Sequence, residues 1–343
     1  MGRYIIRRLL QAVPLLILIT VIVFVLLKTV GDPLAYLAQD PRVTEADRIM
    51  LRARLGLNDP LPLQFVHWLI GDDWYMRDVT GDGVPDEYGQ RLGILRGDFG
   101  ESIRYRRPVT DVIGEFLPNT LLLGTTAYVV TIVVSLGIGI FAALRQYTLA
   151  DNIITGVAFV TYSMPIFFIA LLSVFIFSVS AKQAGLPYLP VQGMYDVRGD
   201  RSVWDLARHM ILPAFSIAAI NIAGYSRYVR STMLEVISSD YILTARSKGL
   251  PERRVIYLHA LKNAALPLIT LIGLTMPFIL SGAVVTETIF AWPGMGRLFI
   301  TSLEYLDSPV LIIFVLMTAI AVVVFQLITD VLYAWLDPRV RYD

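Results

Sequence analysis

The sequence is poor in charged residues and contains no cysteine among its 343 residues. Asp, Glu, Lys and Arg make up 17% of the chain, whereas soluble proteins usually carry about 25%. Hydrophobic residues make up 56%, so the composition predicts a polytopic membrane protein. Without cysteine the chain can form neither a disulfide nor a thiolate metal site. The formal net charge of +1 provides no overall field that would favour nucleic acid.

Patterns typical of catalysis and of ATP binding are also missing. No Gly-x-x-x-x-Gly-Lys-Ser/Thr loop occurs, so this chain does not bind ATP in that way. His67, His209 and His259 stand apart from one another, and we interpret all three as structural. The apolar runs hold almost no ionisable residue, whereas a proton-coupled transporter normally buries one in its path. An intramembrane enzyme would need a catalytic pair at depth, so we expect a non-catalytic chain whose energy comes from outside it.

Six runs are long and apolar enough to cross a hydrocarbon core of about 30 Å. They lie at residues 9–27, 120–144, 153–180, 210–226, 264–285 and 310–329. The first run has no small-residue cleavage site after it, so we interpret it as a retained span rather than a signal peptide. The fourth is the weakest, because it is short and holds Asn221, Gly224 and Tyr225.

Basic residues predict the orientation of these spans, because short positively charged segments stay on the cytoplasmic side. Arginines precede the first span, Arg145 follows the second, and seven basic residues crowd the segment after the fourth: Arg227, Arg230, Arg246, Lys248, Arg253, Arg254 and Lys262. Both termini are therefore expected in the cytoplasm.

The spans and their orientation predict four parts of the chain. Residues 1–30 form an N-terminal cytoplasmic segment and the first span, and residues 31–116 an extracytoplasmic subdomain. Residues 117–335 form the membrane core with a cytoplasmic coupling loop at 236–262, and residues 336–343 a cytoplasmic tail. Within the subdomain, residues 44–57 are typical of an amphipathic helix that Thr44 caps, with Asp47 at the third position.

A polar and basic stretch at residues 240–249 interrupts the apolar pattern. Asp240 is suited to cap a helix, and Gly249 is suited to end it in the left-handed conformation. Pro251 would then begin a second helix. The spacing places four residues on one face of the first helix: Tyr241, Thr244, Ala245 and Lys248. Because Ala245 and Gly249 are small, a partner could approach the backbone closely; the alternative is a basic loop helix that lies on lipid headgroups.

Several motifs resemble those of one transporter family. Thr244-Ala245, Gly249, Asn263-Ala264 and Leu266-Pro267 resemble the EAA loop of ABC importer permeases, in the form found in peptide permeases. The family's leading Glu is replaced here by Tyr241 or Leu243, depending on the register. Other segments that resemble the peptide permeases are 97–103, 117–121, 287–296 and 330–342. The long segment 31–116 is similar to the B-type rather than the C-type permease subunit.

The resemblance implies an all-α, type I ABC importer fold with six transmembrane helices, in which residues 240–249 dock on an ATPase. It implies four partners besides the lipid membrane of a prokaryotic cell: a C-type permease subunit that completes a heterodimer, two ABC ATPase subunits that bind ATP and Mg, and an extracytoplasmic substrate-binding protein. The implied cargo is a di- or oligopeptide. A nickel chelate, an opine, glutathione or a sugar stays open as the alternative, since this subunit's sequence is a poor guide to cargo. A passive channel would leave the docking loop without a purpose.

Polar residues within the predicted spans are candidates to line a translocation path. The candidates are Ser163, Met164, Pro165, Asn221, Tyr225, Thr275 and Ser281. Pro165 predicts a kink, because proline leaves a backbone carbonyl free. Polar residues in spans more often form hydrogen bonds between helices, and this alternative stays open.

An acidic loop in the segment 31–116 is not explained by the permease pattern. Its candidate calcium ligands are Asp78, Thr80, Asp82, Val84, Asp86 and Glu87. Oxygens at alternate positions around Gly83 are what a calcium loop needs, although the twelfth position is Gly89 rather than Glu. The alternative is a solvated acidic turn.

Overall fold

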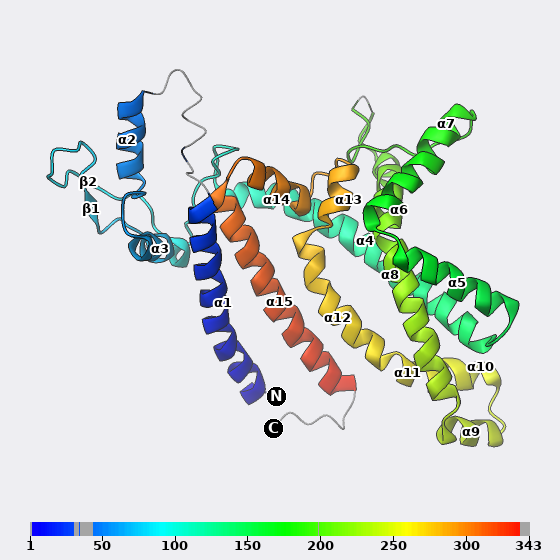
Figure 1. Cartoon of the computed structure of the whole chain (residues 1–343). Helices are drawn as coiled ribbons and strands as arrows, with labels where there is room; N and C mark the ends of the chain where they lie inside the picture. The colour runs from blue at the N-terminus through cyan, green and yellow to red at the C-terminus, as the bar shows by residue number, and fades with distance from the viewer. Residues whose placement is uncertain (1, 31–33, 35–43, 198, 337–343) are drawn as a thin grey trace. The chain divides into compact units, whose positions relative to one another are not determined.

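The computed structural model describes residues 2–30, 34, 44–197 and 199–336 (Figure 1). The described chain is mainly α-helical and contains one two-stranded sheet, which confirms the all-α prediction. It divides into two compact units, one made of Arg7–Phe116 and Leu298–Ile320, the other mainly of Leu117–Arg297 and the residues from Ala321 onward. The expected tail at 336–343 lies, apart from Leu336, outside the described residues.

Five helical segments among the described residues are long and apolar enough to cross a membrane. They are Ile5–Thr29, Val109–Leu144, Ile166–Gln183, Val203–Ile237 and Ser308–Val331. The first, second, fourth and fifth lie within α1 (Gly2–Val30), α4 (Val109–Leu144), α8 (Val203–Ile237) and α15 (Ser308–Leu336). The chain is therefore a polytopic membrane protein. At the expected span 264–285 the structure has α12 (Leu266–Ser281), which has 16 residues and stops at Gly282 with φ +78°.

The prediction of one continuous span at 153–180 is wrong. Helix α5 (Leu149–Ser163) ends where Met164 takes an extended conformation, and Pro165 precedes α6 (Ile166–Val174). Proline has no N–H to continue the ladder, and it disfavours the helical conformation of the residue before it. The break therefore falls where the kink was expected. Helix α6 continues through the π-helical turn η3 (Phe175–Ser180) into α7 (Ala181–Gln183).

The fourth span is longer than the predicted 210–226. Helix α8 has 35 residues and begins after Ser202, whose hydroxyl accepts from Asp205 N. Asn221, taken as a weakness of this span, donates its side-chain amide to Ile217 O at 2.8 Å within the same helix. The helix therefore continues past the two arginines that were expected to follow it, Arg227 and Arg230.

The unit that holds residues 44–104 contains a small subdomain. Helix α2 (Glu45–Arg54) carries the predicted cap, since Thr44 and Asp47 bond each other's backbone N–H. Helix α3 (Leu61–Ile70) follows, and β1 (Met76–Arg77) then pairs antiparallel with β2 (Glu87–Tyr88). The helical turn η2 (Ile94–Arg96) packs against α3.

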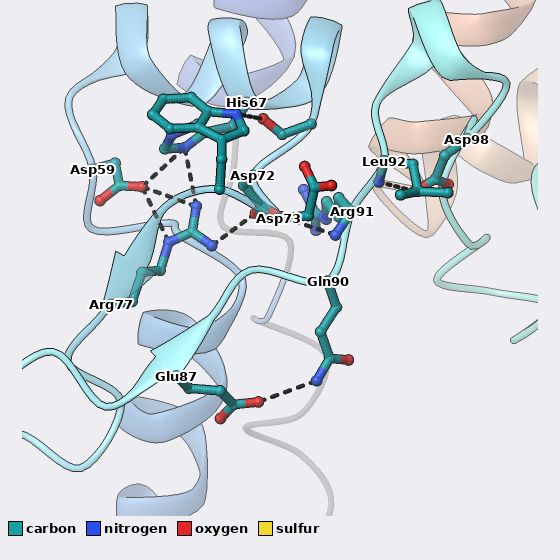
Figure 2. Close-up of polar contacts among 12 residues, drawn as sticks. Asp59, His67, Asp72, Asp73, Arg77, Glu87, Gln90, Arg91, Leu92 and Asp98 are labelled. Atoms are coloured by element: carbon teal, nitrogen blue, oxygen red, sulfur yellow. Dashed lines mark hydrogen bonds and ion pairs between the residues drawn. The ribbon is translucent and has the colours of Figure 1, made fainter.

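A buried polar network holds this subdomain together (Figure 2). The guanidinium of Arg77 lies 2.7 Å from Asp72, 3.2 Å from Asp59 and 3.0 Å from His67 Nδ1. Asp72 also accepts from Arg91 N at 2.8 Å. Since a buried charge is stable only when it is paired, Arg77 and Asp72 fix the loops between α3 and η2. Burial, reinforced by Arg77, holds the pKa of His67 below its usual value.

A second buried carboxylate joins two distant segments of the same unit. Asp307 lies between α14 (Met295–Glu304) and α15, and it is fully buried. Its oxygens accept from Ser102 Oγ, and from the N–H groups of Ile103 at 3.1 Å and Arg104 at 3.2 Å. The segment preceding α4 is therefore pinned to the turn that begins α15.

Candidate functional site

The coupling loop begins as a separate short helix after α8 (Figure 1). Helix α9 (Asp240–Ser247) follows Ser239, so Asp240 lies in its first turn rather than at the predicted cap position. Gly249 has the left-handed conformation that we expected, with φ +73°. Pro251 precedes α10 (Glu252–Arg254) as its N-cap rather than as its first residue. The predicted order of short helix, glycine turn and second helix is confirmed.

Helix α9 is anchored by two buried side chains. Ile242 and Ala245 are buried in an apolar cluster that includes Met233 of α8 and Val255 and Ile256 of the π-helical turn η4 (Val255–Ala260). Burial of this cluster makes α8, α9 and η4 one packed body. Ala245 is thus part of the chain's own core, and its side chain does not offer the close approach to a partner that its size suggested.

The outward face of α9 carries the remaining predicted residues. Tyr241, Thr244 and Lys248 are exposed, and so is Leu243, which the sequence analysis noted only as a replacement for the family's Glu. Tyr241 Oη accepts from the side-chain amide of Asn263 at 2.8 Å. This links α9 to α11 (Leu261–Ala264), the short helix that leads into α12. The exposed face is therefore held in place by the buried side chains of Ile242 and Ala245 and by the hydrogen bond between Tyr241 and Asn263.

An ion pair closes the turn between α9 and α10. Arg246 donates to both carboxylate oxygens of Glu252, with Nη2–Oε1 at 2.6 Å and Nε–Oε2 at 3.2 Å. The hydrogen bonds from Arg246 hold the pKa of Glu252 below its usual value. Because both side chains are exposed, the pair adds little to stability, although it spans the turn at Gly249.

Three hydroxyl groups meet between α4, α8 and α12. Tyr225 Oη lies 3.0 Å from Thr275 Oγ1 and 3.2 Å from Tyr128 Oη. Tyr128 Oη also contacts Thr275 Oγ1 and lies 3.1 Å from Ile272 O. A shared hydroxyl cluster of this kind joins helices where apolar packing alone would leave them free to slide.

A cavity of about 310 Å³ opens beside the hydroxyl cluster. Asn221 and Thr275, both predicted for the path, line it together with Tyr128, Thr120 and Glu287, which the sequence analysis missed. The predicted Tyr225 does not line it, but bonds to Tyr128 and Thr275, which do. The other four candidates, Ser163, Met164, Pro165 and Ser281, are not among the residues that line it. Ser163 donates instead to Phe159 O at 2.9 Å in its own helix.

A buried carboxylate is among the groups that line the cavity. Glu287, in α13 (Val284–Ile289), accepts from Thr120 Oγ1 at 3.0 Å, Ala283 N at 3.3 Å and Arg297 N at 3.1 Å. A Cβ atom on Gly294 would lie 2.5 Å from Glu287 Oε2. A larger residue there would displace the carboxylate, which explains the glycine in the Pro293-Gly294 motif. Burial raises the pKa of Glu287.

In the segment 287–296, which resembles the peptide permeases, a short turn joins two helices. Residues 284–289 form α13 and α14 begins at Met295, so the turn is confined to the residues between them. Trp292 is fully buried there, and its indole Nε1 donates to Asn119 O at 3.0 Å. The turn is thereby fixed against the start of the second predicted span. A polar Asn-Thr pair at that start was the signal in the sequence that could have located Thr120.

The acidic loop at 78–87 is folded around its own backbone. Asp78 accepts from Gly81 N at 2.6 Å and Gly83 N at 2.7 Å. Asp86 accepts from Val79 N at 2.8 Å. Within the described part of the chain no three His, Cys, Asp or Glu residues form a group that could hold a metal ion. The geometry is that of a solvated acidic turn, and calcium binding at this loop stays a prediction.

The side chains of the remaining candidate ligands of the loop either have contacts of their own or are exposed. Asp82 accepts from Val84 N at 2.9 Å, and the side chains of Thr80 and Val84 are exposed. Glu87 forms an ion pair with Arg54 of α2 at 2.8 Å. A calcium ion would therefore have to replace these contacts.

Comparison with protein families gives matches over nearly the whole chain. The model of the "Binding-protein-dependent transport system inner membrane component" matches residues 135–342. A second model, described as the N-terminal part of a binding-protein-dependent transport system membrane component, matches residues 1–124.

Similar proteins of known name align from end to end. The chain is 39% identical over 344 residues to "Oligopeptide transport system permease protein AppB" of Bacillus subtilis (strain 168), covering 100% of both chains. It is 35% identical over 364 residues to "Dipeptide transport system permease protein DppB" of Escherichia coli (strain K12), covering 100% of this chain and 99% of the relative.

A solved structure shares the fold. A chain of the MetNI methionine ABC transporter, in an inward facing conformation, superposes with a TM-score of 0.50 over 66% of this chain and 96% of its own. The sequences are 13% identical, so the likeness concerns the fold alone.

Proposed function

This chain belongs to the family of binding-protein-dependent transport system inner membrane components, and we propose that it is the permease subunit of an ABC importer for di- or oligopeptides. The observation that carries this proposal is the construction of α9. Ile242 and Ala245 fix the helix to the membrane core, while Tyr241, Leu243 and Lys248 remain exposed on its outer face. Such a helix can pass a displacement to the core without deforming, because a packed interior is nearly incompressible.

Four partners follow from the proposal. Two ATPase subunits hold ATP and Mg, and one of them receives the exposed face of α9. A C-type permease subunit completes the heterodimer, and an extracytoplasmic binding protein delivers the substrate. This chain is then a non-catalytic part of the translocase, in the cytoplasmic membrane of a prokaryotic cell. Both termini and α9 lie on the cytoplasmic side and the 44–104 subdomain on the outer side, as the basic residues beside α8 support.

The proposed mechanism is a switch between outward- and inward-facing states. ATP-driven closure of the ATPase subunits moves α9. Because Ile242 packs against Met233 and Val255, α8 and η4 move with it. Helix α8 itself carries Tyr225 of the hydroxyl cluster, and η4 leads through α11 into α12, which carries Thr275. The substrate path is expected to open or close there.

The peptide cargo is supported by the cavity and by the names of the relatives. Hydroxyl and amide groups of Thr120, Tyr128, Asn221 and Thr275 line it, and these groups can bond a peptide backbone without selecting a side chain. Among the described residues that line the cavity, Glu287 is the only one with a carboxylate or cationic side chain. Its oxygens already accept from Thr120, Ala283 and Arg297, so it is not required to bind cargo.

Transport by the reconstituted assembly tests the proposal. The chain is produced together with the products of its neighbouring genes and placed in proteoliposomes with ATP. We expect ATP-dependent accumulation of a labelled dipeptide or oligopeptide that unlabelled peptides abolish. Accumulation that only a nickel chelate, an opine, glutathione or a sugar abolishes would replace the peptide cargo with that solute. Accumulation that is independent of ATP would contradict the importer.

A further inference from the structure

We propose that helix α3 (Leu61–Ile70) is a membrane-surface helix whose outward face is immersed in lipid at the boundary between headgroups and acyl chains. The proposal concerns the subdomain that follows α1 and does not depend on the cargo. It rests on three observations: the distribution of polar residues around α3, the contact of α3 with α1, and the state of the backbone groups at its ends.

Helix α3 has its polar side chains on the inside and its apolar side chains on the outside. Gln64 donates to Leu57 O at 3.1 Å and to Asp59 O at 2.7 Å, and His67 is buried against Arg77. Away from these contacts the surface of the helix is apolar, and Leu61, Val66 and Ile70 are 39%, 38% and 41% exposed. A helix on the surface of a water-soluble domain shows the reverse distribution. The exposed face of α3 therefore fits an apolar surrounding.

The contact with α1 places α3 near the end of a membrane span. Phe65 and Trp68 of α3 pack on Phe24 of α1, with ring centroids 5.5 Å and 5.8 Å apart. Phe24 lies within the span Ile5–Thr29, five residues before its last residue. At a rise of about 1.5 Å per residue, α3 crosses α1 within about 10 Å of that end. Lys28, whose Nζ lies 5.6 Å from the Phe24 ring centroid, and Trp68 are the residue types that mark the interface between membrane and water.

The ends of α3 leave few backbone groups that need water. At the start of the helix Pro62 carries no N–H, and the N–H groups of Leu63 and Gln64 both donate to Pro60 O. At its end Gly71 N donates to His67 O, and Arg96 Nη2 donates to Ile70 O at 2.7 Å. Unpaired backbone groups are costly in lipid, so these bonds make partial immersion possible.

Lipid is the occupant that these observations favour. The apolar face of α3 is continuous with the membrane-embedded surface of α1 through the Phe24, Phe65 and Trp68 contact. A surface helix of this kind is typically immersed by about 5–10 Å. A binding protein or a second permease subunit that covers the same face is the competing possibility, and the experiment separates it from lipid.

The absence of native cysteine makes a site-specific measurement possible. Val66→Cys and Ile70→Cys are labelled with an environment-sensitive fluorophore in the full-length chain, in nanodiscs. Quenching by lipids that carry a spin label near the headgroup is compared with quenching by aqueous iodide. The matched controls are Ile49→Cys and Met50→Cys on α2, which are also exposed and apolar and belong to the same subdomain.

We expect lipid quenching at residues 66 and 70 to exceed that at residues 49 and 50 several-fold, and iodide quenching to show the reverse order. Equal quenching at all four sites would overturn the proposal. Shielding of residues 66 and 70 from both quenchers would also overturn it, because a protein would then cover α3. The control sites show how strongly each quencher acts on exposed apolar positions of the same subdomain that lie outside α3.

Discussion

Asp151 and Arg230 form a bidentate ion pair between α5 and α8. Arg230 Nε lies 2.7 Å from Asp151 Oδ1, and Nη2 lies 2.7 Å from Oδ2. Asp151 also accepts from Tyr147 N at 3.0 Å, so the same carboxylate holds the segment that connects α4 and α5. Since α8 leads directly into α9, this pair extends the packed body of the coupling loop to the helix that ends at the Met164–Pro165 break.

Loss of the ion pair between Asp151 and Arg230 is expected to lower the stability of the unit that contains it. It is also expected to reduce the uptake obtained for each ATP hydrolysed. Arg230→Gln leaves the carboxylate of Asp151 buried without its charge partner, which typically costs 3–5 kcal/mol for a fully buried pair. We expect about 2 kcal/mol here, because the side chain of Arg230 is 24% exposed. Thermal unfolding in nanodiscs and the ratio of uptake to ATP hydrolysis measure the two effects.

A neighbouring arginine provides the control for this variant. Arg227→Gln removes the same charge from the same helix, but its guanidinium lies over the Phe159 ring at 5.6 Å rather than on a carboxylate. We expect a loss of about 0.5–1 kcal/mol and an unchanged transport ratio. Equal effects of the two variants would show that the Asp151–Arg230 pair has no special part in coupling.

A bulky residue at Gly249 is expected to separate ATP hydrolysis from uptake. The φ of +73° costs other residues about 1–2 kcal/mol, although no atom lies within 4 Å of where a Cβ would be. Gly249→Leu should therefore reorient the turn rather than create a clash. We expect normal amounts of the chain in the membrane, continued ATP hydrolysis and a strong loss of uptake.

The control for Gly249 is a glycine in ordinary helical conformation. Gly156 lies within α5, and a Cβ there would also meet no atom within 4 Å. Gly156→Leu should retain uptake. Wild-type uptake in Gly249→Leu would count against the docking of α9 on a motor subunit.

Removal of one hydroxyl from the Tyr128, Tyr225 and Thr275 cluster tests its role in joining three helices. Tyr225→Phe deletes the bonds to the other two hydroxyls and is expected to cost about 1 kcal/mol. Tyr162→Phe, at an exposed tyrosine, should leave stability unchanged. Thermal unfolding in nanodiscs compares the two variants. An equal shift of the unfolding temperature in both would show that the hydroxyl cluster makes no special contribution to stability.

The 44–104 subdomain is expected to lose stability as the pH falls below about 6.5. Burial and Arg77 lower the pKa of His67 from its usual 6.5, although Asp59 and Asp72, which also face it, act in the opposite direction. Below this pH the unfolded chain binds a proton that the folded chain does not, so the free energy of unfolding decreases until the lowered pKa is crossed. Above this pH His67 is neutral in both the folded and the unfolded chain, so it does not make the free energy of unfolding depend on pH.

Limited proteolysis at about pH 7.5 and about pH 5.5 measures this dependence. His67→Gln should reduce the difference between the two pH values, whereas His259→Gln in the coupling loop should leave it unchanged. If proteolysis of the wild type and of His67→Gln depends on pH in the same way, titratable groups other than His67 cause the dependence.

The sequence was informative where a local pattern determines the structure. Thr44 and Asp47 predicted their helix cap, and Gly249 its left-handed turn, because both depend on neighbouring residues alone. The continuous span 153–180 was wrong because apolar composition is the same in one long helix and in two helices, and only Pro165 marks the break between them. Ala245 was misjudged because its burial depends on Val255 and Ile256, which only the tertiary fold brings to it.

The cavity was the least predictable part of the candidate site. Thr120 and Tyr128 lie on α4 and Glu287 lies on α13, and no spacing in the sequence connects these two helices. Asp151 and Arg230 are 79 residues apart and pair through the packing of α5 on α8. Side chains that meet only through helix packing leave no periodic signal along the chain.

Cross-linking from the exposed face of α9 tests the central claim most directly. Leu243→Cys and Lys248→Cys are introduced into the cysteine-free chain, and the full assembly is treated with a thiol-reactive cross-linker in oriented membrane vesicles. We predict that both sites react from the cytoplasmic side only and that each forms an adduct with an ATPase subunit, with a yield that changes on addition of ATP. Labelling of these sites from the outer side, or an assembly in which neither site reaches a second polypeptide, would contradict the account.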